Sequence, residues 1–221
     1  PLYSSAASDV YKRQVAQMVN RAKAVNSERV VLVGPDIASD DGGTMSAVFA
    51  AAAVAAVIAG NTDPSVPING AELTLFGAAG KRLSDNEIDQ LVRGGVTPIE
   101  TVGGVSSPVR GITTKTSSGG AADTTWRELT TILIVDEVIP TIRSALRTRF
   151  ARSKNTAQSR GAIRSQVVLE LEEMKSREIV DSYGEVLVSA LKSDPTVCLV
   201  EFSFTVAHGL NRIYLTAHIT V

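Results

Sequence analysis

Apolar positions along this chain recur with two periods, one typical of amphipathic helices and one typical of strands. The helical spacing predicts helices over 14–27, 47–59, 84–93, 136–152 and 156–175. The segment 47–59 is apolar at every position, so we expect a buried helix there, ended by Gly60. Ser84 and Glu87 have the spacing of a capping box, which predicts where the short helix begins.

Runs rich in β-branched residues predict strands between and after these helices. They cover 29–34, 97–102, 108–114, 196–207 and 212–221. The segment 126–134 is either a strand or the start of a helix, and its β-branched residues favour a strand. We expect the glycine-containing segment 103–107 to join two of them as a hairpin, and 115–122 to be a mobile loop. The last strand alternates strictly and follows a turn at 208–211. Its apolar side carries Ile213, Leu215, Ala217, Ile219 and Val221.

These elements predict an α/β fold, with an α+β mixed sheet flanked by helices and a C-terminal β-strand arm. We expect the core domain to cover 15–195 and the arm to cover 196–221. A chain that ends on an apolar strand has an edge that must be paired or covered. Strand addition to another chain would cover it.

The first residues have another origin in our interpretation. Residues 4–14 resemble one reading frame of a sequencing adapter, so we set 1–14 aside as an adapter-derived artefact. Native sequence is then expected from about Val15, with an N-terminal portion of the gene missing.

Composition excludes few functions. The 221 residues carry a net charge of −1 and are 44% hydrophobic, which permits a sizeable core and gives no global reason to expect nucleic acid or an anionic membrane. The apolar run 47–59 is shorter than the roughly 20 residues that cross a bilayer. Cys198, the single cysteine, has apolar neighbours and is expected to be a buried strand thiol.

No motif indicates catalysis. The loop 34–43 follows a strand and precedes a helix, as in a βαβ unit, but it lacks the glycine fingerprints of phosphate sites. Its aspartates also lack the spacing of a calcium loop. The acidic groups on the predicted helices, and His208 and His218, match no acid/base or ligand pattern. We therefore expect no enzyme, no catalytic residue, no metal and no cofactor.

A local excess of positive charge stands out in this nearly neutral chain. No acidic residue lies between Glu137 and Glu170. Seven basic residues occupy that interval: Arg143, Arg147, Arg149, Arg152, Lys154, Arg160 and Arg164. They form either a solvated face answered by the acidic residues of 170–178 or a docking face for an acidic partner. Nucleic acid is disfavoured because no aromatic residues for stacking are interleaved.

The order of segments resembles the contractile tail sheath proteins of myophages and their relatives in pyocins and type VI secretion. The alanine-rich segment 48–60 precedes a proline-containing loop, and Gly95-Val96-Thr97-Pro98-Ile99 is similar to the family's G-V-N-x-I. Residues 109–114, Val-Arg-Gly-Ile-Thr-Thr, are similar to its v-x-G-x-R-T-T. Trp126-Arg127-Glu128-Leu129 then leads to the long helices and the terminal strands, so the resemblance covers about 28–221.

The resemblance implies a mechanical role in a virion tail assembled in the bacterial cytoplasm. Family members stack as rings around a tail tube and contract to drive it through a cell envelope. Implied partners are other sheath subunits, the tube protein, and baseplate and terminator proteins, without nucleic acid or membrane insertion. The terminal arm, 196–221, would add strands between subunits, and Arg143, Arg147, Arg160 and Arg164 are our charge-based candidates for tube or subunit contact.

Two other classes remain open at this point. A small α/β metabolic enzyme or ligand-binding domain would need convergent polar groups at the carboxyl ends of strands. A nucleic-acid-binding module would depend on the basic segment and would lose affinity steeply with added salt.

Overall fold

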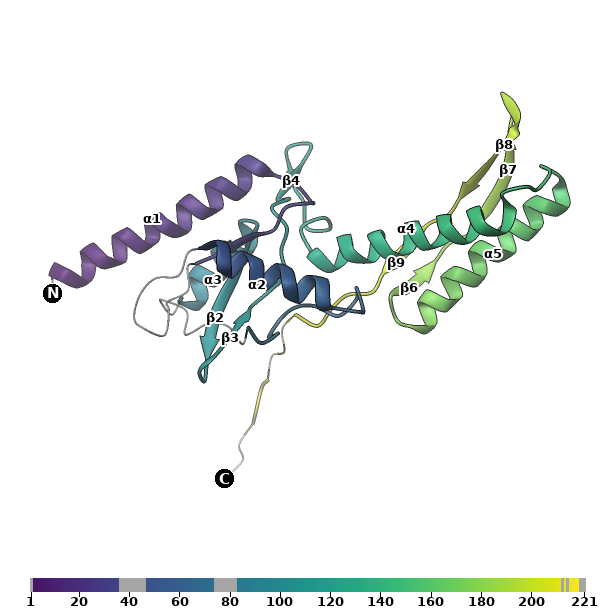
Figure 1. Cartoon of the computed structure of the whole chain (residues 1–221). Helices are drawn as coiled ribbons and strands as arrows, with labels where there is room; N and C mark the ends of the chain where they lie inside the picture. Colours follow the sequence, from purple (N-terminus) through teal and green to yellow (C-terminus); the bar gives the residue numbers. More distant parts are fainter. Residues whose placement is uncertain (1, 36–46, 74–82, 212, 214, 219–221) are drawn as a thin grey trace. The chain divides into compact units, whose positions relative to one another are not determined.

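The structure is a computed structural model that describes residues 2–35, 47–73, 83–211, 213 and 215–218 (Figure 1). The chain forms two compact units. The first unit comprises 1–62, 66–132 and 209–221, and the second comprises 63–65 and 133–208. Each unit has its own hydrophobic core. The sequence pattern did not indicate this division.

Three helices belong to the first unit: α1 (Leu2–Val25), α2 (Ala47–Gly60) and α3 (Asp85–Arg93). The predicted helices are confirmed, although α1 begins twelve residues before the expected start at residue 14. The capping box of α3 is also confirmed. The Ser84 backbone N–H donates to the Glu87 carboxylate at 2.8 Å, and the Ser84 hydroxyl accepts from the Glu87 backbone N–H at 3.4 Å. These bonds satisfy backbone donors that the first turn of a helix leaves unpaired.

A three-stranded sheet contains β1 (Leu32–Gly34), β2 (Val96–Val102) and β3 (Val105–Pro108) in the order β1-β2-β3. β1 and β2 are parallel, as expected for a βαβ unit, and β2 and β3 are antiparallel. The predicted hairpin is confirmed, but its second strand is β3 (Val105–Pro108) and not 108–114. Gly103 and Gly104 have φ of +61° and +86°, and such a two-residue glycine turn starts the return strand at once.

The segment 109–114, predicted as a strand, is outside the strands except for an isolated bridge between Ile112 and Glu128. The predicted mobile loop 115–122 instead contains a small hairpin of β4 (Ser117–Ser118) and β5 (Ala121–Ala122). Gly119 and Gly120, both with positive φ, provide its turn by the same two-glycine geometry.

The core of the first unit lies where α1 and α3 meet the start of β2. Its buried apolar residues are Val15, Ala22, Leu83, Ile88, Leu91, Val92, Val96 and Ile112. The backbones approach closely here, because a Cβ on Gly94 would lie 2.4 Å from Cγ2 of Val19. Gly94 therefore ends α3 and also makes room for α1.

The prediction that the alanine-rich helix is buried was wrong for most of α2. Ala50 and Val54, one turn apart, are buried, whereas Val48 and Phe49 are 71% and 55% exposed. One stripe of the helix thus packs on the unit, and the opposite face is equally apolar. An apolar pattern shows that a face can be buried, but not how many faces find a partner.

The second unit is built on α5 (Ala157–Ser176) and on most of α4 (Leu129–Phe150), whose residues 129–132 belong to the first unit. The core between these helices and the strands contains Ile134, Val138, Ile142, Val167, Leu171, Met174, Ile179, Val180 and Val186. The prediction of α5 over 156–175 is confirmed, with Thr156 as its N-cap. The interpretation of 126–134 as a strand was wrong, because α4 begins at Leu129 and burying one side of a long helix outweighs the β-propensity of its first residues.

The helix predicted over 136–152 would have Pro140 in its first turn. Because α4 begins earlier, Pro140 lies in the helix interior and its ring is exposed.

Two antiparallel strand pairs complete the second unit. β6 (Val180–Tyr183) pairs with β9 (Phe204–Val206), and β7 (Leu187–Leu191) pairs with β8 (Asp194–Glu201). The strand prediction for 196–207 is thus confirmed as two strands with local partners. Its expected pairing with the last segment was wrong, since residues 213 and 215–218 lie in no strand. Ile219 and Val221 lie outside the described residues.

Candidate interaction surfaces

The basic residues of α4 lie on an exposed surface of the second unit. Arg143 and Arg147 are four residues apart, so they share a helix face, and both side chains are exposed. Neither guanidinium has an ion-pair partner among the described residues. These two cations are accessible to a partner from outside the unit.

The basic residues of α5 are engaged within the unit. Arg160 donates to the Asn155 Oδ1 at 3.0 Å, and Arg164 Nε donates to the Val186 carbonyl at 3.0 Å. Arg164 also lies 3.9 Å from a Glu185 carboxylate oxygen. The four predicted contact arginines therefore differ in their bonding: Arg160 and Arg164 bond to neighbouring residues of their own unit, although Arg164 is exposed, whereas the two arginines of α4 are exposed without an ion-pair partner among the described residues.

A hydrogen-bond chain connects Arg149 of the basic segment to Glu170 on α5 through Gln166. Arg149 donates to Oε1 of Gln166, and the Gln166 side-chain amide donates to Glu170 at 2.7 Å. Gln166 is 8% exposed, so both its polar ends are satisfied inside the helix pair. This hydrogen-bond chain involves Arg149 alone, so it does not neutralise the charges of Arg143 and Arg147.

The outer face of the β7–β8 hairpin carries exposed apolar side chains. Alternate residues face in opposite directions: Val188 and Val200 pack against the core, while Leu187 and Leu199 are 52% and 41% exposed. In the part of the chain that the structure describes, the hairpin has no third strand. Cys198 lies on β8, as predicted, but is only half-buried.

The C-terminal segment returns to the first unit and then presents apolar side chains to solvent. Asn69 Nδ2 donates to Asn211 Oδ1 at 2.8 Å, which holds the start of this segment. Beyond it, Ile213 and Leu215 are 77% and 91% exposed, and Ala217 is exposed. Exposed apolar residues in an unpaired segment are typical of a binding element that lacks its partner.

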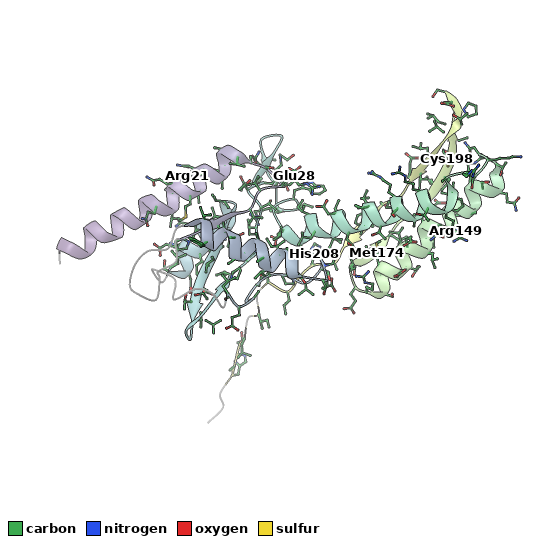
Figure 2. The ribbon with its side chains drawn as sticks, in the orientation of Figure 1. Arg21, Glu28, Arg149, Met174, Cys198 and His208 are labelled. Atoms are coloured by element: carbon green, nitrogen blue, oxygen red, sulfur yellow. The ribbon has the colours of Figure 1, made fainter. Side chains whose placement is uncertain are left out.

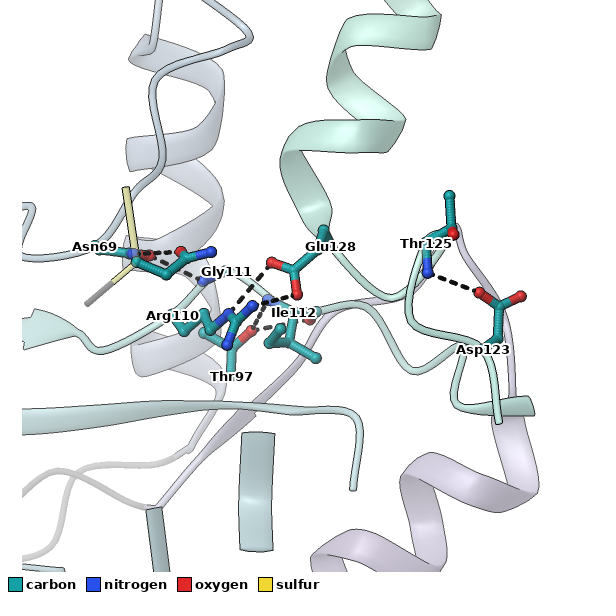
Figure 3. A network of polar contacts seen from close by, with 9 residues as sticks. Asn69, Thr97, Arg110, Gly111, Ile112, Asp123, Thr125 and Glu128 are labelled. Atoms are coloured by element: carbon teal, nitrogen blue, oxygen red, sulfur yellow. Dashed lines mark hydrogen bonds and ion pairs between the residues drawn. The ribbon is translucent and has the colours of Figure 1, made fainter. Parts of the chain in front are cut away.

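A polar network fixes the segment 109–114 to the start of α4 (Figure 3). Arg110 Nη2 lies 2.6 Å from Glu128 Oε1, and both side chains are partly buried. The Thr97 hydroxyl bonds both the N–H and the carbonyl of Ile112 at 2.9 Å. Sequence reasoning missed the Arg110–Glu128 pair, because 18 residues separate its members and no local pattern links them.

No cluster of three potential metal ligands occurs among the described residues. The pKa of Tyr183 is raised chiefly because its hydroxyl donates to Glu172, and the pKa of Asp194 is lowered because the hydroxyl and N–H of Thr196 donate to it. Asp194 is exposed and Tyr183 is half-buried, and both shifts come from local hydrogen bonds. Within the described chain, every helix is too short or too polar to cross a membrane. Figure 2 shows the side chains over both units.

The sequence of this chain is similar to known phage proteins. Residues 121–220 match the family model of the phage tail sheath C-terminal domain. A tail sheath protein of Bacillus phage SP01 is 29% identical over 206 residues. The resemblance to contractile tail sheath proteins is confirmed. The match covers 90% of this sheath-like chain but 35% of the phage protein.

Solved sheath structures share the fold. The sheath tail protein of Listeria innocua superposes with a TM-score of 0.71 at 15% identity, covering 82% of this chain and 44% of the other. The contracted sheath complex of the extracellular contractile injection system PVC has a TM-score of 0.67 at 14% identity, covering 93% of this chain and 60% of the other. The predicted α/β class is confirmed. All candidate contact residues except Val221 fall within the residues matched to the sheath domain.

Proposed function

We propose that this chain is part of a structural subunit of a contractile tail sheath. In this proposal the subunit polymerises around a tail tube, and the polymer contracts to drive the tube through a cell envelope. The observation that carries the proposal is the match of 121–220 to the sheath C-terminal domain. The work is mechanical, so it requires neither a catalytic residue nor a cofactor.

Its partners would be other sheath subunits, the tube protein, and baseplate and terminator proteins. Its place would be the virion tail, after assembly in the bacterial cytoplasm, without nucleic-acid binding or membrane insertion. The name of the PVC structure, a sheath complex in a contracted state, supports an assembly of this kind.

Strand addition would connect the subunits. The segment 196–221 contributes two kinds of element to this proposal: strands with open edges and an unpaired tail. In the described residues β7–β8 and β6–β9 are both two-stranded, so each can accept a further strand. The exposed Ile213, Leu215 and Ala217, with Ile219 and Val221 beyond them in sequence, would enter a neighbouring sheet.

The basic residues would make the second contact. Arg143 and Arg147 are exposed on one face of α4 and would bind an acidic surface of the tube or an adjacent subunit. Arg160 and Arg164 would extend this surface along α5, although part of their hydrogen-bonding capacity is used within the unit.

Antibodies raised against this chain should label the tail of contractile particles made by the source of the gene. We expect label along the outer tail wall, over a length that shortens when the particles contract. The measurement is immunogold electron microscopy of extended and contracted particles. Label confined to capsids, or particles without label although the chain is expressed, would contradict the sheath proposal.

Reversing both exposed charges of α4 should weaken binding to purified tail tubes. We expect Arg143→Glu with Arg147→Glu to reduce tube binding by about tenfold or more at low salt, because repulsion replaces attraction at two positions. Co-sedimentation of the chain with tubes measures this.

A matched control is Lys175→Glu with Lys192→Glu, which makes the same change in net charge at two exposed positions of the second unit. We expect the control to bind within about twofold of the original chain, since its charges lie outside the proposed contact. Equal losses in both variants would mean that net charge, and not the α4 face, determines binding.

A further inference from the structure

The chain contains a single Asn-Gly dipeptide, Asn69-Gly70, in the segment between α2 and α3. Asparagine is one of the chemically labile residues of proteins. When glycine follows it, no side chain hinders the approach of the next backbone nitrogen to the asparagine carboxamide. This dipeptide is therefore the position in the chain most prone to spontaneous deamidation.

The structure holds both reacting groups away from this reaction. The Gly70 N–H, whose nitrogen would be the nucleophile, donates to the Pro108 carbonyl at 2.9 Å. The Asn69 carboxamide is held at both ends: its oxygen accepts from the Gly111 N–H at 3.3 Å, and its nitrogen donates to Asn211 at 2.8 Å. Figure 3 shows Asn69 between Gly111 and the C-terminal segment.

We propose that Asn69-Gly70 is a latent deamidation site that the fold protects, with Asn211 of the C-terminal segment as one part of that protection. The reaction requires the Asn69 side chain to turn toward Gly70, and this breaks its bonds to Gly111 and Asn211. Displacing the C-terminal segment removes one of these bonds and makes the site more reactive. The proposal does not depend on the sheath function.

The reagent is water. The Gly70 nitrogen loses its proton and forms a bond to Cγ of Asn69, while the bond from Cγ to Nδ2 breaks and ammonia leaves. Water then opens the cyclic imide at either carbonyl, giving aspartate or isoaspartate at position 69. No oxidant, reductant or enzyme is needed.

The product would alter the start of the C-terminal segment. A carboxylate at position 69 still accepts from the Gly111 N–H, but it has no N–H to donate to Asn211. The Asn211 carboxamide would have to turn over to keep a bond. Deamidation is thus expected to weaken the attachment of the segment irreversibly.

Mass spectrometry of the tryptic peptide that contains position 69 tests the proposal. The native chain and the chain unfolded in guanidinium are incubated side by side at mildly alkaline pH, and conversion is followed over time. We expect conversion in the unfolded chain to be about tenfold faster or more, because all three bonds are then absent. Equal rates in the native and unfolded chains would overturn the protection.

Two variants test the part played by Asn211. Asn211→Ala removes the acceptor and is expected to raise the native rate about fivefold, the effect of losing one net hydrogen bond. Asn211→Asp keeps an oxygen acceptor and is expected to stay near the original rate. Circular dichroism establishes that both variants are folded, and Asn61 and Asn86, which precede larger residues, serve as unmodified positions in the same digest. A native rate unchanged in Asn211→Ala would remove Asn211 from the proposal.

Discussion

Leu171→Ala is expected to lower the free energy of unfolding of the second unit by about 2–5 kcal/mol. Leu171 is fully buried in the core that α4 and α5 share with the strands. Removing its side chain loses apolar burial and leaves a cavity, and close-packed helices fill such a cavity only in part. Chemical denaturation followed by far-UV circular dichroism measures the shift in midpoint.

Leu169→Ala is the matched control, because it makes the same chemical change on the same helix. Leu169 is 57% exposed, so its truncation should change the free energy of unfolding by no more than about 0.5 kcal/mol. Similar losses in the two variants would contradict the assignment of the α5 face that packs in the core.

Local patterns in the sequence predicted most helices well. The capping box predicted the start of α3. The helical spacing predicts one apolar face of α5 with Ile163, Val167, Leu171 and Met174; the last three are buried and Ile163 is half-buried. Both features depend on residues three or four positions apart, whose spacing follows from helix geometry alone.

The errors arose where distant residues decide the structure. The first residues of α4 read as a strand because their β-branched side chains fit either element, and packing in the second unit settled the choice. The extent of α2 burial depends on what else packs against it, which its own sequence does not contain.

The candidate contact residues were predicted from local positive charge and from the alternation of apolar residues in the last segment. The structure shows that the arginines among them differ in their bonding partners. Bonding within the unit separates the two pairs: Arg160 bonds to Asn155 and Arg164 to the Val186 carbonyl, whereas Arg143 and Arg147 have no ion-pair partner among the described residues. The Asn69–Asn211 bond joins residues 142 positions apart, so no pattern in the sequence indicated it. Charge patterns thus located a basic segment. Only the fold showed which of its arginines are bonded within the unit.

Gly95→Ala is expected to destabilise the first unit by about 2–5 kcal/mol, combining backbone strain and overpacking. Gly95 has φ of +83°, a left-handed conformation that a side chain disfavours. A Cβ there would lie 2.8 Å from Cγ2 of Thr116 and 3.2 Å from the backbone of Thr114. The nearby backbone cannot move aside without disturbing the buried Thr114. Thermal unfolding followed by circular dichroism measures the loss.

Gly103→Ala separates the two causes of that loss. Gly103 also has positive φ, +61°, but a Cβ there would meet no atom within 4 Å. Backbone strain alone should then cost about 1–2 kcal/mol. The excess loss at Gly95 therefore measures how closely the turn after α3 packs against 114–116. If Gly95→Ala costs no more than Gly103→Ala, the turn has room to adjust and the close approach does not limit stability.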